Sequence, residues 1–265
     1  FEQCQIRAIF SSKPEPNALA SHVSIDPPVR FVAEPLDGYW ESGFTITGDF
    51  KPGSVYKVTL KKGIPSAAGA ELGQTIERVI QFPDRPQSLA FTSDGRYLSP
   101  RGKLLIPLEA MNVRGYIASV APVFANNLVH FAHRDTGLDS HYGPKAQRLT
   151  GRATTITNAL VAKPNEAARA TLSLRDYVQG EPSGAYWVQI QPVSRIIGDD
   201  EEYYPSWQTD GRLMVITDLG FAARTANNGV LIWVNSLRLA QPVTNAEIVL
   251  YALNNQEIGR TTTDD

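Results

Sequence analysis

The strongest constraint on the fold is that apolar residues recur at every second position, in short runs that turn residues interrupt. Tyr56, Val58 and Leu60 alternate with lysine and threonine. The segment 186–191 repeats this pattern with three apolar residues on one face. A period of two is typical of a β-strand with one buried face. The segment 230–235 is almost continuously apolar, which predicts a more fully buried strand.

Turn residues separate these runs. Pro52 and Gly53 occupy the two central positions of residues 51–54, which is the pattern of a type II turn. The pair Asn254-Asn255 lies between two strand-like segments and predicts a tight hairpin. Long helical periodicity is missing: residues 158–169 are the only plausible helical stretch, and a proline interrupts it.

Strands at this spacing predict an all-β fold of tandem antiparallel β-sandwich domains, each of about 100 residues. With 265 residues, the chain has room for one to three domains. We expect one boundary where a proline-bounded strand ends near residue 86, and another in the acidic segment 199–211. The predicted domains are therefore 1–88, 89–210 and 211–265. The last range holds three or four strand signals, fewer than the roughly seven of a sandwich, so the third domain is expected to be incomplete.

Composition excludes several classes of protein. The net charge of −2 gives no basic field for nucleic acid. No run approaches the roughly 18 apolar residues of a membrane span. The single cysteine, Cys4, excludes a disulfide within the chain. The sequence starts at Phe1 without a signal-like segment, so we expect the native start and any targeting signal to lie upstream.

Histidine is the first candidate for site chemistry. Three imidazoles, at His130, His133 and His141, could bind a catalytic zinc ion. However, the metalloprotease spacing of two histidines around a glutamate is absent, and residues 129–131 are expected to end a strand. Side chains three apart on a strand point to opposite faces, which argues against a metal site.

Three other candidates also favour a structural interpretation. The acidic run 199–202 could ligate calcium, but nothing in its spacing wraps ligands around an ion, and a solvated loop is favoured. Ser183 lacks the first glycine of a nucleophile elbow and is expected in a turn. Cys4 has no evident base and is expected to be a small buried residue at the start of a strand. The polar loop 134–152 either has a function or is a disordered surface loop without one. We therefore predict no catalytic, cofactor-binding or metal-binding residue.

Aromatic residues allow a binding function as an alternative. Trp40, Trp187 and Trp207 could stack on sugars in an Ig-like adhesion or glycan-binding module, although all three would serve equally well in a core. Tyr203 and Tyr204 could pack at a domain junction or form a contact patch.

Four successive motifs near the carboxyl end resemble the macroglobulin-like domains of bacterial alpha-2-macroglobulins. They read VITDLG at 215–220, VLIWVNSL at 230–237, PVTNAEIVLY at 242–251 and NNQEIG at 254–259. Further upstream, the segments 23–28, 48–53 and 56–60 resemble the Ig-like module that precedes such domains, and Asn126-Asn127-Leu128 fits the module that follows. The resemblance implies an Ig-like domain at 1–88, a macroglobulin-like domain at 89–210 and the start of another at 211–265, in an amino-terminal piece of a longer protein.

This resemblance implies a periplasmic, non-enzymatic protease trap without a cofactor. In that family a protease cuts a bait region, and the resulting rearrangement cages the protease; some members add a thioester carried by Cys-x-Glu-Gln. Cys4 is followed by Gln-Ile-Arg, so its order is wrong for a thioester, and no segment stands out as bait. The implied partners are proteases and a periplasmic peptidoglycan synthase. Nucleic acid is not expected, and a membrane only through an anchor outside the chain. A hydrolase has the least support.

Overall fold

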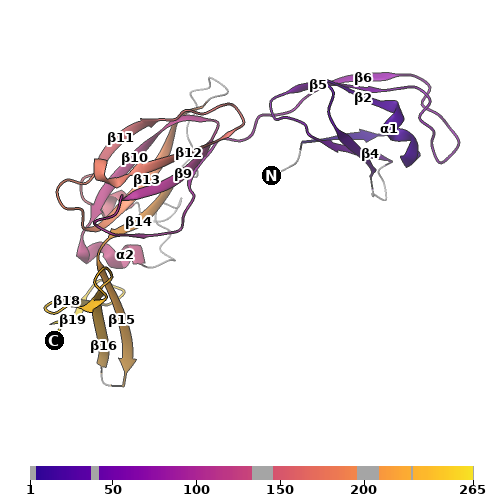
Figure 1. The fold of residues 1–265 in the computed structure, drawn as a ribbon. Helices are drawn as coiled ribbons and strands as arrows, with labels where there is room; N and C mark the ends of the chain where they lie inside the picture. The colour runs from indigo at the N-terminus through magenta and orange to yellow at the C-terminus, as the bar shows by residue number, and fades with distance from the viewer. Residues whose placement is uncertain (1–3, 37–41, 133–145, 196–208, 228, 265) are drawn as a thin grey trace. The chain divides into compact units, whose positions relative to one another are not determined.

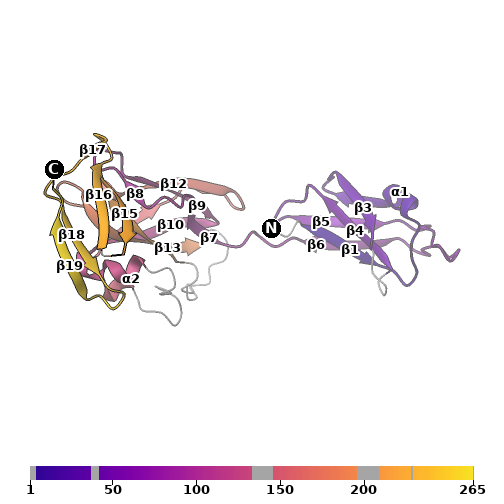
Figure 2. The same cartoon turned by 90° about the horizontal axis from the view of Figure 1, so that it is seen from below.

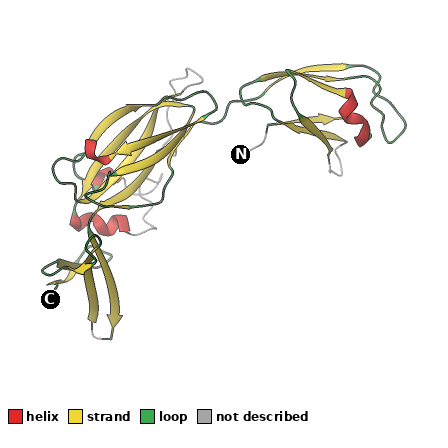
Figure 3. Cartoon of the chain, in the orientation of Figure 1, coloured by secondary structure: helices red, strands yellow, loops and turns green. Residues whose placement is uncertain are grey.

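The structure is a computed structural model, which describes residues 4–36, 42–132, 146–195, 209–227 and 229–264. The described chain consists mostly of β-strands, with short helices at a few strand ends (Figure 3). It divides into two compact units, residues 1–86 and residues 87–265. Each unit has its own buried core, which confirms the predicted all-β fold of tandem antiparallel sandwiches.

The first unit is a small sandwich of two three-stranded antiparallel sheets (Figure 1). One sheet has the order β1-β4-β3, formed by Gln5–Ile9, Gly43–Gly48 and Phe31–Pro35. The other has the order β2-β5-β6, formed by Val23–Asp26, Val55–Leu60 and Ile76–Gln81. The helix α1 (Leu19–His22) precedes β2. Alternation directs one side chain in two inward, so that the core is filled by Phe44, Ile46, Tyr56 and Val58 among others.

The local predictions for this unit are confirmed. Tyr56 and Val58 are buried in β5, whereas the intervening Lys57 is exposed. Gly53 has a φ of 72°, and the Ser54 amide donates to the Lys51 carbonyl at 3.2 Å, as a type II turn requires. The positive φ explains why glycine is needed at this position.

The second unit begins with a larger sandwich, which we call the second sandwich. Its five-stranded sheet has the order β11-β10-β13-β14-β8 and its three-stranded sheet the order β12-β9-β7. The strands of this sandwich, in chain order, are β7 (Ser88–Phe91), β8 (Tyr97–Leu98), β9 (Leu105–Met111), β10 (Val113–Val123), β11 (Thr154–Ala159), β12 (Ala167–Ser173), β13 (Gly184–Arg195) and β14 (Asp210–Ile216). Both sheets contribute to one apolar core, in which Leu108, Val188 and Ile190 are fully buried.

The rest of the second unit, residues 217–264, forms what we call the third module. It contains an antiparallel sheet, β15-β16-β17, built from Leu219–Ala226, Gly229–Ser236 and Gln241–Pro242. It also contains a hairpin of β18 (Glu247–Tyr251) and β19 (Glu257–Thr262) (Figure 2). The turn at Asn254-Asn255 joins these two strands, with Asn255 at a φ of 66°, which confirms the predicted hairpin.

The structure corrects three sequence-based expectations. Residues 158–169 are not helical, because they comprise the end of β11, a turn at Asn165 and the start of β12. Residues 129–131 are not a strand end but lie in helix α2 (Leu128–Ala132). The segment 230–235 forms most of β16 as predicted, but Val230, Leu231 and Trp233 are exposed because the described chain packs little against this sheet.

The pairing of β14 with β13 indicates where the second domain ends. The apolar run 213–216, which we assigned to the domain 211–265, lies in β14 and pairs with β13 from Gly184↔Ile216 to Ile190↔Asp210. Met214 and Ile216 are buried in the second sandwich. The predicted domains 1–88, 89–210 and 211–265 stay a prediction, and we propose that the second one extends to Ile216.

Candidate functional site

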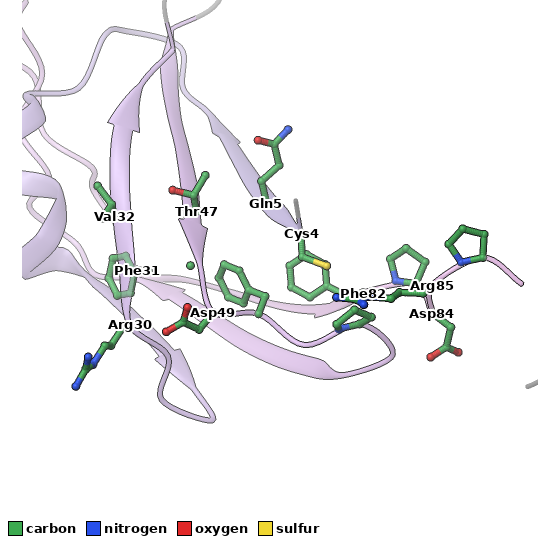
Figure 4. A pocket seen from close by; sticks show the side chains of 15 residues that line it. Cys4, Gln5, Arg30, Phe31, Val32, Thr47, Asp49, Phe82, Asp84 and Arg85 are labelled. Carbon is green, nitrogen blue, oxygen red and sulfur yellow. The ribbon is translucent and has the colours of Figure 1, made fainter. Parts of the chain in front are cut away.

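The candidate site is a groove of about 1000 Å³ that lies entirely within the first unit (Figure 4). Its walls come from the ends of β1, β3 and β4, from the turn that follows β4, and from the segment that follows β6. The residues that line it are Cys4, Gln5, Arg30, Phe31, Val32, Thr47, Gly48, Asp49, Phe50, Pro52, Phe82, Pro83, Asp84, Arg85 and Pro86.

The groove is apolar at its base and polar at its edges. Phe50 and Phe82 are buried, with ring centroids 4.9 Å apart, whereas Arg30 and Asp49 are exposed. The backbone holds these two charged residues side by side, because the Asp49 amide donates to the Arg30 carbonyl at 3.2 Å. Such an arrangement suits contact with a peptide-like surface better than bond cleavage, which needs an activated nucleophile.

Among the residues that line the groove, Cys4 is the one that was considered as a nucleophile from the sequence. It is half-buried rather than fully buried, and it lies directly before β1. The residues lining the groove include no histidine to act as its base. The groove therefore shows no pair of nucleophile and imidazole base of the kind that cysteine catalysis uses.

Most of the other residues considered from the sequence fall outside the described residues. His130 lies in α2, and His133 and His141 fall outside the described residues. The acidic run 199–202 and most of the loop 134–152 also fall outside them. Across the described ranges, no group of three or more histidine, cysteine, aspartate or glutamate side chains is placed to hold a metal ion.

Ser183 lies directly before β13. It is exposed, it precedes Gly184 at a φ of 104°, and its carbonyl accepts a hydrogen bond from the Tyr186 hydroxyl at 2.9 Å.

Trp187 is a core residue rather than a platform for sugars. Only 8% of it is exposed, and its ring lies 5.4 Å from that of Phe131 in α2. Gly211 on the neighbouring strand leaves room for the indole, since a Cβ there would lie 2.6 Å from it. Trp40, Tyr203, Tyr204 and Trp207 fall outside the described residues.

Two buried tyrosines carry perturbed acid–base properties. Burial raises the pKa of Tyr116, and the neighbouring Tyr177 adds to the effect. Burial also raises the pKa of Tyr177, partly offset by a hydrogen bond of 3.2 Å that Asn158 donates to its hydroxyl. Both tyrosines belong to the core of the second sandwich, so the shifts reflect packing rather than an active site.

On the β18–β19 hairpin, Arg260 forms ion pairs with Glu247 and, at 2.8 Å, with Glu257. The hydrogen bond from Arg260 lowers the pKa of Glu257 and in turn raises the pKa of the guanidinium. All three side chains are exposed, so this cluster is a cross-strand surface contact.

Asp218 was not singled out from the sequence, yet it is the centre of a hydrogen-bond cluster. Its carboxylate accepts from the Ser236 hydroxyl at 2.6 Å and from the Arg238 amide at 3.0 Å. Its carbonyl accepts from the Leu237 amide at 2.7 Å. Asp218 and Ser236 lie in two of the motifs that carry the resemblance, but the sequence alone does not show that their side chains meet.

Among the described residues, no helix combines the length and the apolar character needed to span a bilayer.

Comparison with known proteins shows similarity to bacterial alpha-2-macroglobulins. Residues 216–265 match the family model described as the bacterial alpha-2-macroglobulin MG3 domain. The alpha-2-macroglobulin homolog of Yersinia pestis is 23% identical over 218 residues, which is 74% of this chain and 10% of that protein. The alpha-2-macroglobulin of Pasteurella multocida is 23% identical over 219 residues, which is 76% of this chain and 11% of that protein. The chain therefore spans about a tenth of the length of the curated relatives it matches.

Solved structures share the fold. A crystal structure of Escherichia coli alpha-2-macroglobulin spanning domains MG0-NIE-MG1 aligns with a TM-score of 0.52 and 20% identity, covering 98% of this chain and 82% of that one. Salmonella alpha-2-macroglobulin reacted with methylamine aligns with a TM-score of 0.64 and 18% identity, covering 98% of this chain and 15% of that one.

The fold is therefore one of tandem β-sandwich modules. Residues 216–265 are similar to the MG3 domain of bacterial alpha-2-macroglobulins, and about three quarters of the chain are similar to curated bacterial alpha-2-macroglobulins.

Proposed function

We propose that this chain supplies frame domains of a bacterial alpha-2-macroglobulin that inhibits proteases by trapping them after bait cleavage. The observation that carries the proposal is the MG3 match at 216–265, which follows on two β-sandwiches in one chain. In this proposal the chain itself is not an enzyme, because the protease supplies the chemistry when it cuts the bait.

The interior of the described chain is consistent with a framing role. The buried aromatic and aliphatic side chains form the separate cores of the two units, and the perturbed tyrosines lie inside the second of these. The proposed partners follow the family: proteases bind the full-length protein, which acts in the periplasm, and a peptidoglycan synthase is a further candidate. An anchor to the membrane would lie outside this chain.

The test uses the full-length protein and a protease of broad specificity. After cleavage, a trapped protease keeps its activity on a small chromogenic peptide but loses most of its activity on a large protein substrate, because only the peptide diffuses into the cage. A full-length variant with a deleted bait region serves as the matched control. Equal loss of activity on both substrates, or no loss on either, contradicts trapping by this protein.

A further inference from the structure

The connection between the second sandwich and the third module is short. Strand β14 ends at Ile216 and β15 begins at Leu219, so only Thr217 and Asp218 lie between them. We call these two residues the joint. Modules within a chain usually move relative to each other unless something holds them, and here the connection itself is available to do so.

The sandwich holds the joint from one side. The Thr217 amide donates to the Leu98 carbonyl at 3.0 Å, and the Val215 amide donates to the Arg96 carbonyl at 2.7 Å. These bonds continue the parallel pairing of β14 with β8 as far as Ile216, whose side chain is 1% exposed. The chain entering the joint therefore cannot swing without breaking the sheet edge and uncovering a core residue.

The third module holds the joint from the other side. The Asp218 carboxylate and carbonyl together accept from the Ser236 hydroxyl and from the amides of Leu237 and Arg238. Ser236 is 6% exposed, and its hydroxyl oxygen also accepts from the Leu239 amide at 3.1 Å. Hydrogen bonds to an ionised carboxylate are shorter and stronger than neutral ones, so Asp218 ties the end of β16 firmly to the start of β15.

Thr217 adds a hydrogen bond within the joint itself. Its hydroxyl oxygen accepts from the Leu219 amide at 2.9 Å, which fixes the turn between the two strands. Thr217 is thus bonded to the sandwich through its amide and to β15 through its hydroxyl, while Asp218 is bonded to the end of β16. Rotation about ψ of Thr217, or about φ or ψ of Asp218, would break at least one of these bonds. The φ of Thr217 is confined by sterics to negative values, because its side chain is β-branched.

We propose that Thr217 and Asp218 form a rigid joint, so that the second sandwich and the third module move as one body. In a protein that rearranges, a joint of this kind would transmit a displacement of the third module to the sandwich rather than absorb it. The inference stands on the hydrogen bonds of the joint and does not depend on the trapping function.

The test measures distances between spin labels in the full 265-residue chain. The native thiol is removed by Cys4→Ser, and labels are placed at the exposed positions Glu166→Cys in the sandwich and Thr225→Cys in β15. A second pair, Glu166→Cys with Thr155→Cys, lies within the sandwich and gives the width expected for a rigid body. The proposal predicts that the width across the joint stays within about twofold of this internal width, whereas a hinge exceeds it.

Two insertions sharpen the comparison. Gly-Ser-Gly-Ser placed between Thr217 and Asp218 should broaden the distribution across the joint at least about twofold, because such linkers behave as flexible coils. The same insertion between Asn254 and Asn255 lengthens a hairpin turn away from the joint and should leave the width unchanged. A wild-type distribution across the joint that is more than about twofold wider than that of the internal pair overturns the proposal. This comparison needs no insertion variant, so it decides the matter even if those variants fold poorly.

Discussion

The core of the second sandwich gives the clearest quantitative prediction. Ile190 is 0% exposed at the middle of β13, where it pairs with Ala118 of β10 on one side and Asp210 of β14 on the other. In the variant Ile190→Ala three side-chain carbons are lost, and their transfer term is about 2.4 kcal/mol at about 0.8 kcal/mol each. The central strand is paired on both edges and cannot collapse inward, so a cavity term raises the expected destabilisation to about 3–4 kcal/mol.

The assay is urea unfolding followed by hydrogen exchange and mass spectrometry, which reports each unit separately. With a slope of about 2 kcal/mol/M, the loss lowers the midpoint for β10 and β13 amides by about 1.5–2 M. The amides of β4 and β5 in the first unit should keep their midpoint, because that unit has its own core.

The matched control is Gln191→Ala, one residue further along the same strand on the exposed face. Exposed substitutions of this kind change stability by about 0.5 kcal/mol or less. A cost for Ile190→Ala no greater than that of Gln191→Ala, or an equal loss of stability in the first unit, would show that the two cores are not organised as described.

Three further predictions address particular contacts. Burial raises the pKa of Tyr116 and Tyr177, so the folded state favours the neutral phenols. This contribution to stability is fully present below about pH 10 and is lost as pH rises through the folded-state pKa. Tyr177→Phe should therefore make the melting temperature fall less steeply above about pH 10. Asn165→Ala should cost about 2 kcal/mol in urea unfolding, since Asn165 has a φ of 61° and exchanges hydrogen bonds of 2.6 and 3.2 Å with Asn112, whereas Asn165→Gly should recover the backbone part of that loss. Gly53→Ala should destabilise the first unit by about 1 kcal/mol through its φ of 72°, and an unchanged midpoint would contradict the turn assignment.

Local features of the fold could be predicted because short-range chemistry determines them. Alternation at Tyr56 and Val58, the turn at Gly53 and the hairpin at Asn255 each depend on residues a few positions apart. Helix α2 could not be predicted in this way, since its Val129 and Phe131 favour a strand locally. Its helical form depends on packing, because Phe131 in α2 contacts Trp187, which lies on the distant strand β13.

The exposure of β16 and the existence of the candidate groove could not be predicted from residues close together in the sequence. An apolar run such as 230–235 reports what a strand can bury but not whether a partner covers it, and Trp233 is 48% exposed in the described chain. The groove joins Cys4 with Asp49 and Phe82, which are far apart in sequence and meet only through strand pairing. The cluster at Asp218 could not be predicted from the sequence, because it depends on the register of β15 against β16.

In the proposed function, these modules are the frame of a protein that rearranges when a protease cuts it elsewhere. Small-angle X-ray scattering of the full-length protein before and after limited cleavage by a protease tests this directly, with the protein treated with inactivated protease as the reference. We expect a clear decrease in the radius of gyration after cleavage, while the amides of the cores around Ile190 and Phe44 keep their protection from exchange. An unchanged radius of gyration after complete cleavage would contradict a framing role in a protein of this kind.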